Sequence, residues 1–506
     1  MSQLKYGVVL SYASMGVGVI ASLVSTPVIL RTLGQSEWGL YQLVASVVGY
    51  LGLLGFGFAS AYVRFYVRAE ASDDEDAVSK LNGLFLLAFL SMGAAAAVIG
   101  VIMVFNTRLV LGNKLTSEEI AAAQALTAIM SVTLALSFPA SLFDCFITAS
   151  ERFLFLRVLG LIRAVATPSL SILAVLIGLK SMGLALVVAV VAVGCAIASL
   201  VHSVRRLGMR FRLSGLDLSL LREIAVFSFY VFIFMVVDQA NWSVDKFILG
   251  RTQGTATVAV YALAASLNAH YVSVSSVVSS VFIPRVNRLV VGADDNSELT
   301  RLLTRVGRIQ FMILTLVGLG LVVFGRPFIG FWVGAEFSDA YPILLLLVIP
   351  VTVPLIQNLG IEIQKAKNMH QFRAWTYVGI AALNVSISIP LAQRYGGVGA
   401  AFGTAVSLIL GNGLLMNWYY HRRVGLDMRY FWKSIIALVP ALTPAALLGL
   451  AIMVFVEFEN PWIMITWATA FAMLYCCSMW IFGMDTSEKD IVRRPLARLS
   501  RRGFIH

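Results

Sequence analysis

Charged residues are scarce in this chain, and cysteines are few. Of its 506 residues, 13% are charged and 59% are hydrophobic. Soluble proteins carry roughly 25% charged residues, so the composition excludes a soluble multidomain protein and predicts an integral membrane protein with many spans. The four cysteines all lie in apolar segments without metal-ligand spacing. We interpret them as small apolar side chains that fill packed regions.

The chain also lacks the motifs of common enzymes. It contains no Gly-x-Ser-x-Gly, no phosphate-binding P-loop, no paired loop carboxylates and no cluster of metal ligands. The loops on the side opposite the termini are short, which leaves no external catalytic domain. We therefore expect no enzyme, no cofactor and no metal site. Without a P-loop, we expect that the chain does not itself hydrolyse ATP.

Long apolar runs are abundant. A membrane-spanning helix needs about 20 mostly apolar residues, and fourteen segments qualify. The segments are 6–30, 39–63, 81–105, 120–144, 158–178, 183–203, 223–249, 258–282, 309–331, 342–361, 375–391, 398–419, 434–456 and 462–482. The first is too long for a signal-peptide core and is interpreted as an uncleaved helix. The sequence thus predicts an all-α integral membrane protein with about fourteen transmembrane helices and both termini on one side.

Basic residues are divided unequally between the two sides of this topology. Of the 38 lysines and arginines, 29 lie on the side of the termini and two, Arg163 and Lys246, inside spans. The other seven lie on the opposite side: Arg31, Arg108, Lys114, Lys180, Arg251, Arg326 and Arg394. Because cytoplasmic loops carry the excess of basic residues, we predict cytoplasmic termini. This distribution accounts for the net charge of +12 without a nucleic-acid partner.

Two stretches of the chain repeat each other. Residues 28–47 read VILRTLGQSEWGLYQLVASV, and residues 247–266 read FILGRTQGTATVAVYALAAS. At an offset of 220 residues Gly34 matches Gly254 and Tyr41 matches Tyr261, so each copy predicts a hairpin in which glycine supplies the turn. The offset contains six spans. We therefore predict two parallel six-helix lobes, followed by two C-terminal helices, an arrangement typical of transporters. The predicted domains are 1–222, 223–422 and 423–506.

The two hairpins also carry a family resemblance. In TPVILRTLGQSEWGLYQLV a Leu-Gly pair precedes Gly-Leu-Tyr, and in VDKFILGRTQGTATVAVYALA an Asp-x-x-x-Leu-Gly precedes a glycine and Tyr-x-x-Ala. These motifs resemble those of bacterial polysaccharide flippases, the polysaccharide transporter family of the multidrug/oligosaccharidyl-lipid/polysaccharide exporter superfamily. The resemblance implies the multidrug-and-toxin exporter fold, the bacterial inner membrane, and a role in O-antigen or lipopolysaccharide assembly. It also implies that Asp245 fixes the hairpin geometry, together with the matched glycines and tyrosines.

Two ionisable residues inside spans are candidates for ion coupling. Asp238 in span 223–249 and His270 in span 258–282 lie at matching depth from the outer ends of two antiparallel spans. Histidine titrates near neutrality and proton relays use such pairs, whereas the alternative is a structural hydrogen bond between packed helices. Asn241 and Trp242 flank the helix face of Asp238, and we predict that they contribute to substrate binding.

Arginines are the other candidates for substrate binding. The resemblance implies a substrate with a diphosphate, and a guanidinium binds phosphate oxygens bidentately. We predict that Arg163, inside span 158–178, is the main phosphate-binding residue. Arg64 and Arg285 at the inner ends of their spans would contribute. The alternatives are snorkelling of Arg163 to the cytoplasmic surface and positive-inside placement for the other two.

The predicted function is that of a flippase. It would move an isoprenoid-diphosphate-linked oligosaccharide from the cytoplasmic to the periplasmic leaflet by alternating access. The alternatives are a cation- or proton-coupled multidrug exporter and a polysaccharide polymerase enzyme. Expected partners are the lipid-linked oligosaccharide, membrane lipids and other polysaccharide-assembly proteins such as the polymerase. The basic C-terminal tail, RRPLARLSRRGFIH, would contact anionic lipid or serve as an orientation signal alone.

Overall fold

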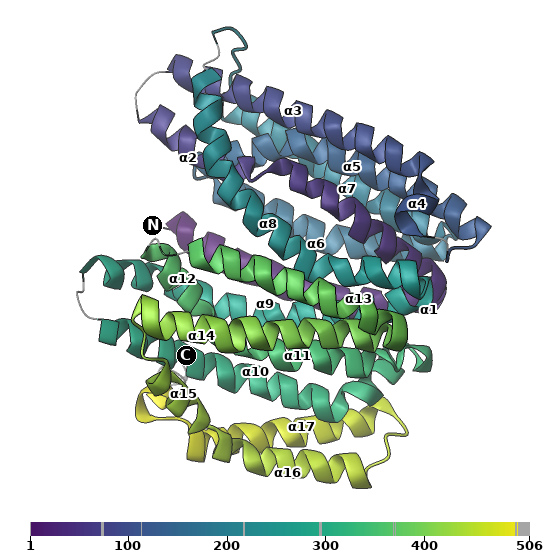
Figure 1. Cartoon of the computed structure of the whole chain (residues 1–506), viewed down its shortest axis with the longest axis vertical. Coiled ribbons are helices and arrows are strands. Elements are labelled where there is room, and N and C mark those ends of the chain that lie inside the picture. The colour runs from purple at the N-terminus through teal and green to yellow at the C-terminus, as the bar shows by residue number, and fades with distance from the viewer. Residues whose placement is uncertain are drawn as a thin grey trace, which may run out of the picture. The chain divides into compact units, whose positions relative to one another are not determined.

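The part of the chain that is described is mostly helical (Figure 1). The computed structural model describes residues 2–71, 75–112, 114–215, 218–292, 296–367, 369, 371–490 and 493, and no strand occurs among them. The expected all-α architecture is therefore confirmed. By its contacts the chain divides into two compact units. Unit 1 comprises Met1–Ala262 and Val385–Ala400, and unit 2 comprises Leu263–Asn384 and Ala401–His506.

Unit 1 consists of long apolar helices joined by short connections. Its complete helices are α1 (Ser2–Gly49), α2 (Phe58–Glu70), α3 (Glu75–Phe105), α4 (Thr107–Leu111), α5 (Ser117–Ala149), α6 (Phe153–Leu176), α7 (Lys180–Val201) and α8 (Leu218–Thr252), with helical turns at Tyr50–Gly55 and His202–Arg206. It also takes the start of α9 (Thr255–Gly292) and the middle of α13 (Gln371–Leu408). In Figure 1, α3, α5 and α7 run side by side, and α1 packs along α6.

Two of the long helices are each a pair of helices that meet at a glycine. α1 is kinked at Gly34, where φ is 77° and ψ is 174°. α13 is kinked at Gly396, where φ is 58° and ψ is −137°. A straight helix as long as α1 would measure about 70 Å, against a hydrocarbon core of about 30 Å. The kinks fall between the first and second predicted spans and between the eleventh and twelfth.

The described helices account for the predicted spans. Ten of them are long and apolar enough to cross a bilayer, and an eleventh crossing results if the bent pair α11 (Ala340–Ile356) and α12 (Asn358–Ala366) is counted as one. Two of the ten segments, Ser14–Glu70 and Phe372–Val424, contain the glycine kinks. α8 contains the predicted span 223–249. Divided at the kinks and taken with the bent pair and α8, the segments correspond to the fourteen predicted spans.

The core of unit 1 is aromatic. Tyr62 on α2 and Phe85 on α3 are almost fully buried, and their rings meet edge to face with centroids 5.1 Å apart. The hydroxyl of Tyr62 donates a hydrogen bond to Oδ1 of Asn82 at 2.6 Å. Between membrane helices, packing and hydrogen bonds of this kind provide the specific contacts, because lipid is as apolar as the side chains. The contacts hold α2 against α3.

Unit 2 contains the remainder of α9 and α13 and the C-terminal helices. Its other elements are α10 (Asn296–Trp332), α11, α12, α14 (Met416–Tyr419), α15 (Met428–Ile436), α16 (Val439–Phe455) and α17 (Pro461–Ser478), with helical turns at Ala335–Phe337, Ile409–Leu415, Tyr420–Val424 and Met479–Gly483. α16 and α17 pack against each other and against α10 (Figure 1).

A buried ion pair fastens the C-terminal part of unit 2 to α10. Arg308 donates from Nε to Oε1 of Glu488 at 2.6 Å and from Nη2 to Oε2 at 2.9 Å. Its guanidinium also donates to the carbonyl oxygens of Ser434 and Gly483. The Glu488 side chain is only 2% exposed. A buried pair needs such additional hydrogen bonds to offset its desolvation, and this pair has them.

Candidate functional site

A cavity of about 520 Å³ lies inside unit 1, among α1, α5, α6 and α7. Arg163 on α6 and Asp144 on α5 are its charged lining residues. Small apolar and hydroxyl side chains form most of the remaining wall, which comprises Gly18, Thr133, Leu136, Ser137, Ala140, Ser141, Ala164, Thr167, Pro168, Val188, Val191, Ala192, Val193 and Ala196. The volume falls within the range of small-molecule sites, about 300–1,000 Å³.

Arg163 lies deep along its helix. α6 begins at Phe153, five residues before the predicted span, so Arg163 is about 15 Å along the helix at 1.5 Å per residue. Its side chain is exposed and lines the cavity. A guanidinium is always charged in proteins. The cavity therefore has a permanent positive charge on one wall.

Asp144 also lines this cavity, and the sequence interpretation did not include it. The hydroxyl of Ser199 on α7 donates a hydrogen bond to its Oδ1 at 2.6 Å, and Arg163 interacts electrostatically with its carboxylate. The predicted span 120–144 ends at this residue, which made it look like a boundary. α5 continues to Ala149 and places Asp144 more than one turn inside the helix. An ionisable residue next to an apolar run was the available signal.

The hydroxyl groups of the cavity keep acceptor capacity. Those of Thr133, Ser137 and Ser141 donate to backbone carbonyls of their own helix, at 2.7 to 2.8 Å. Because a hydroxyl oxygen has two lone pairs besides its donor, each can still accept a hydrogen bond. One cation, one carboxylate and several hydroxyls suit a ligand that bears both phosphate and sugar hydroxyls. In the part of the chain that is described, no group of three or more His, Cys, Asp or Glu side chains could hold a metal ion.

The other two predicted arginines do not line this cavity. Arg64 on α2 lies over the ring of Phe227 on α8, with its Cζ 4.9 Å from the ring centroid. Arg285 lies on α9 in unit 2, directly after Pro284. Both side chains are exposed. The cation–π contact gives Arg64 a packing role, and a substrate role for either residue stays a prediction.

The predicted ion-coupling pair is divided between the two units. Asp238 lies on α8 in unit 1, and His270 lies on α9 in unit 2. The side chains of Asp238, Asn241 and Trp242 lie outside the described part of the chain. Their roles in coupling and substrate binding stay predictions.

The two repeat hairpins meet in unit 1. Gly34 and Gly254 both adopt positive φ, 77° and 98°, a conformation that glycine permits at no steric cost. After the first turn, α1 packs tightly against the start of α9: a Cβ added at Gly39 would lie 1.8 Å from the carbonyl oxygen of Thr255. Only a residue without a side chain permits this approach. The first hairpin is thus held against the second.

Within the second hairpin, a short hydrogen bond joins α8 to α9. The hydroxyl of Tyr261 donates to Oδ2 of Asp245 at 2.5 Å, and Asp245 is 2% exposed. In the first hairpin, Tyr41 instead stacks on Trp38, with ring centroids 5.8 Å apart. The repeated tyrosines therefore make different contacts.

A carboxylate at the same end of unit 1 joins three segments. Oε1 of Glu119 accepts hydrogen bonds from Ser36 at 2.7 Å and from Thr255 at 2.8 Å. Its other oxygen accepts from the backbone N–H of Thr116, which caps α5. This cluster connects the first hairpin, the start of α5 and the second hairpin.

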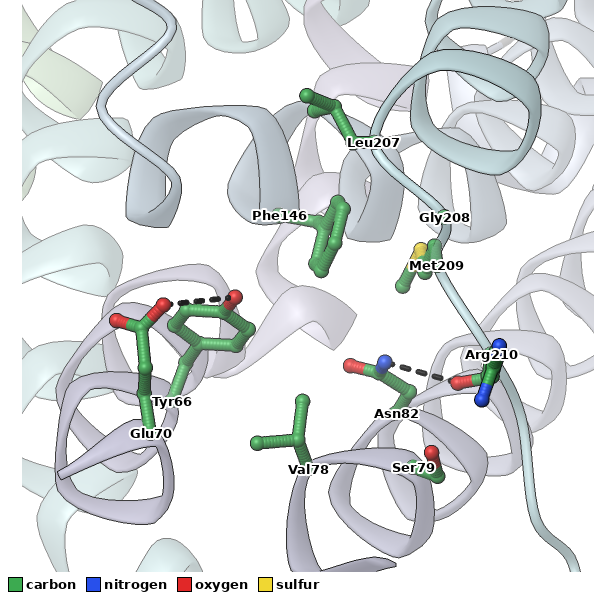
Figure 2. Close-up of a pocket in the computed structure, with 10 residues that line it drawn as sticks. All are labelled: Tyr66, Glu70, Val78, Ser79, Asn82, Phe146, Leu207, Gly208, Met209 and Arg210. Atoms are coloured by element: carbon green, nitrogen blue, oxygen red, sulfur yellow. Dashed lines mark hydrogen bonds between the residues drawn. The ribbon is translucent and has the colours of Figure 1, made fainter. Parts of the chain in front are cut away.

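A second cavity, of about 350 Å³, lies where the segment after α7 crosses α2 and α3 (Figure 2). Asn82 donates from Nδ2 to the carbonyl oxygen of Arg210 at 2.9 Å, and the hydroxyl of Tyr66 points toward Glu70 (Figure 2). Phe146 from α5 faces the same space. None of the predicted site residues lines this cavity. The hydrogen bond from Asn82 to Arg210 fastens the connecting segment to α3.

Sequence comparison places the chain among proteins of polysaccharide assembly. Residues 5–290 match the family model described as polysaccharide biosynthesis protein. An uncharacterized membrane protein of Bacillus subtilis (strain 168), EpsK, is 23% identical over 495 residues, covering 93% of each chain. A putative O-antigen transporter of Shigella flexneri is 19% identical over 411 residues, covering 80% of this chain and 95% of the relative.

Structure comparison identifies the fold. The lipid II flippase MurJ in an inward closed conformation superposes with a TM-score of 0.74 at 15% identity, covering 97% of this chain and 99% of the flippase. An inward-facing multidrug transporter of the MATE family superposes with a TM-score of 0.63 at 12% identity, covering 83% of this chain and 98% of the transporter. The predicted multidrug-and-toxin exporter fold is therefore confirmed.

Proposed function

Because this chain belongs to the polysaccharide biosynthesis protein family, we propose that it is a flippase for an isoprenoid-diphosphate-linked oligosaccharide. It moves the unit from the cytoplasmic to the periplasmic leaflet of the bacterial inner membrane, with both termini in the cytoplasm. The names of two similar proteins, a putative O-antigen transporter and a lipid II flippase, support this class of substrate.

The observation that carries the proposal is the Arg163 cavity. A permanent cation inside a membrane-spanning unit is costly, and such residues mark substrate or ion pathways. The neighbouring hydroxyls and the carboxylate of Asp144 suit sugar hydroxyls, and the guanidinium suits phosphate oxygens. Before substrate binds, Asp144 partly offsets the charge of Arg163. A diphosphate replaces that interaction with a stronger, bidentate one.

Transport proceeds by alternating access between the lobes 1–222 and 223–422, with 423–506 as an added C-terminal part. The lipid tail stays in the bilayer while the sugar occupies the interior. Parallel repeats that rock about a central site are an established transporter design. The hydrogen-bonded cluster around Glu119 joins the two repeat hairpins, at the end that the predicted topology assigns to the periplasm. The product is handed to other proteins of polysaccharide assembly, such as a polymerase.

The test is the leaflet distribution of lipid-linked intermediates in a strain that lacks the protein. Cells are converted to spheroplasts, and exposed glycans are labelled with a membrane-impermeant reagent before and after permeabilisation. If the protein is a flippase, completed lipid-linked units in the deletion strain become accessible to the reagent only after permeabilisation. Complementation with the full chain then restores labelling in intact spheroplasts.

Two other results would replace this function. Single units that reach the periplasmic face but remain unpolymerised would identify a polymerase. An unchanged distribution together with raised drug sensitivity would identify a multidrug exporter.

A further inference from the structure

Three basic residues surround a cavity of about 440 Å³ at one end of unit 1. Arg108 lies on the short helix α4, Lys114 follows that helix, and Arg251 lies near the end of α8. Leu109 and Gly112 complete the lining. All three cations belong to the seven of 38 that the predicted topology places on the outer side. The positive-inside rule disfavours basic residues there, so orientation does not explain them.

The fold brings these cations together through a glycine. Gly112 ends α4 with a φ of 96°. A Cβ added to it would lie 3.2 Å from both Cα and Cγ of Arg251, which is tighter than ordinary van der Waals contact. The missing side chain therefore lets the end of α4 approach α8. The guanidinium of Arg251 lies 5.7 Å from the ring centroid of Phe247, and this cation–π contact limits its movement.

The positive charge of the cavity is not neutralised by the protein. Among the residues that the structure describes, none of the three cations forms an ion pair with a carboxylate. Two carboxylates on the same side of the topology are engaged elsewhere, because Glu119 accepts from Ser36 and Thr255 and Glu37 pairs with Lys180. Like charges held around one cavity repel each other. A bound anion would remove that repulsion.

Exposed apolar side chains lie next to the cations. Leu109, which lines the cavity, is 73% exposed, and Phe105, at the end of α3, is 80% exposed. On a membrane protein, such side chains at a helix end face the acyl region of the bilayer, whereas arginine and lysine reach the level of the headgroups. A ligand that meets both kinds of side chain is an amphiphile with an anionic head.

We propose that the cavity formed by Arg108, Lys114 and Arg251 binds the phosphate head of a lipid in the outer leaflet. The lipid chain lies along Leu109 and Phe105. Two kinds of lipid carry this chemistry: an isoprenoid diphosphate delivered by transport and an anionic phospholipid of the bilayer. Assignment to the isoprenoid diphosphate rests on the proposed function. In that case the cavity receives the product as it leaves the protein and hinders its return.

The test measures lipid binding to the purified full-length protein in detergent by native mass spectrometry. The probes are undecaprenyl diphosphate and phosphatidylglycerol, titrated separately. The test variant is R108Q/K114Q/R251Q. The matched control, R31Q/R326Q/R394Q, removes the same charge from the same predicted side at positions that do not line the cavity. Because three cations are removed from around one anion, the test variant should lose at least about tenfold in affinity.

Each result has a defined meaning. Loss of undecaprenyl diphosphate binding alone, in the test variant but not in the control, supports a product site. Loss of binding of both lipids supports a general site for lipid phosphate. Equal affinities of the two variants for both probes would overturn the proposal. With the unaltered protein, affinity should fall as the concentration of ammonium acetate rises because the contact is electrostatic. An affinity that does not change with ionic strength would overturn the proposal as well.

The outcome separates this site from the proposed function. The test variant could lose binding of phosphatidylglycerol alone while the deletion strain shows a normal leaflet distribution of lipid-linked intermediates. That result would support the lipid site and contradict the proposed flippase function. Units trapped on the cytoplasmic face in the deletion strain, together with equal lipid affinities of the two variants, would support the proposed function and contradict the lipid site.

Discussion

Arg163 and Asp144 differ in what their chemistry allows. Arg163 keeps its charge at every physiological pH and lines the cavity inside unit 1. Asp144 is held by the hydroxyl of Ser199 and acts on Arg163 from the neighbouring helix. The arginine can therefore bind an anion directly, whereas the aspartate sets the field in which it does so.

Substitution of Arg163 should separate charge from geometry. Arg163→Ala removes a charge-assisted contact worth about 1.5–3 kcal/mol, so the rate of export should fall roughly tenfold to a hundredfold. Arg163→Lys should retain part of the activity, because an ammonium keeps the charge but lacks the bidentate fork. The measurement is surface polysaccharide formed per unit time at equal protein level.

Arg157→Ala is the matched control for this series. Arg157 is an exposed arginine on the same helix that does not line the cavity, and its loss should leave export unchanged. Full export by Arg163→Ala would remove Arg163 from the site.

At the scale of elements, glycine determines how closely helices pack. The second arm of α1 approaches the start of α9 at Gly39, where even one methyl group would overlap the backbone of Thr255. Backbone cannot move aside as a flexible side chain can. The same principle brings α4 against α8 at Gly112. Small residues at helix interfaces are the usual means by which membrane helices come close.

Gly39→Ala should therefore destabilise the protein. An added Cβ would lie 1.8 Å from the carbonyl oxygen of Thr255, and forced overpacking costs about 1–3 kcal/mol. The midpoint of thermal unfolding in detergent, followed by loss of the monodisperse peak in size-exclusion chromatography, should fall. Gly160→Ala on α6 is the control, because nothing lies within 4 Å of its added Cβ. Equal unfolding midpoints for the two variants would contradict the close packing of Gly39 against Thr255.

For the whole molecule, orientation in the membrane depends on charge distribution. The sequence places 29 of 38 basic residues on one side of the predicted topology. This imbalance is the basis for the predicted cytoplasmic termini, and both the proposed direction of transport and the proposed outer lipid site depend on it.

The orientation is tested by cysteine labelling in intact cells. In a variant without the four native cysteines, Glu118→Cys near the start of α5 and Arg423→Cys after α14 introduce single exposed thiols. A membrane-impermeant maleimide should label Glu118→Cys in intact cells and Arg423→Cys only after permeabilisation. The reverse pattern would show that the termini lie outside.

The sequence by itself determined the membrane class, the spans and the repeated hairpins, because hydropathy, charge and glycine turns are properties of position along the chain. It also singled out Arg163 as a candidate, since an arginine is rare within an apolar span, and its substrate role stays a prediction. The kink at Gly34 falls where the first repeat hairpin predicted a turn. The kink at Gly396 falls between the eleventh and twelfth predicted spans.

Only the tertiary structure decided which of these residues face each other. Asp144 meets the cavity of Arg163, Tyr261 reaches Asp245, and Arg108 comes near Arg251 only after five separate helices have packed at particular rotations. Rotation about a helix axis depends on side chains of its neighbours, which the local pattern does not contain. A sequence thus specifies which charges enter the membrane, whereas packing specifies which of them form a site.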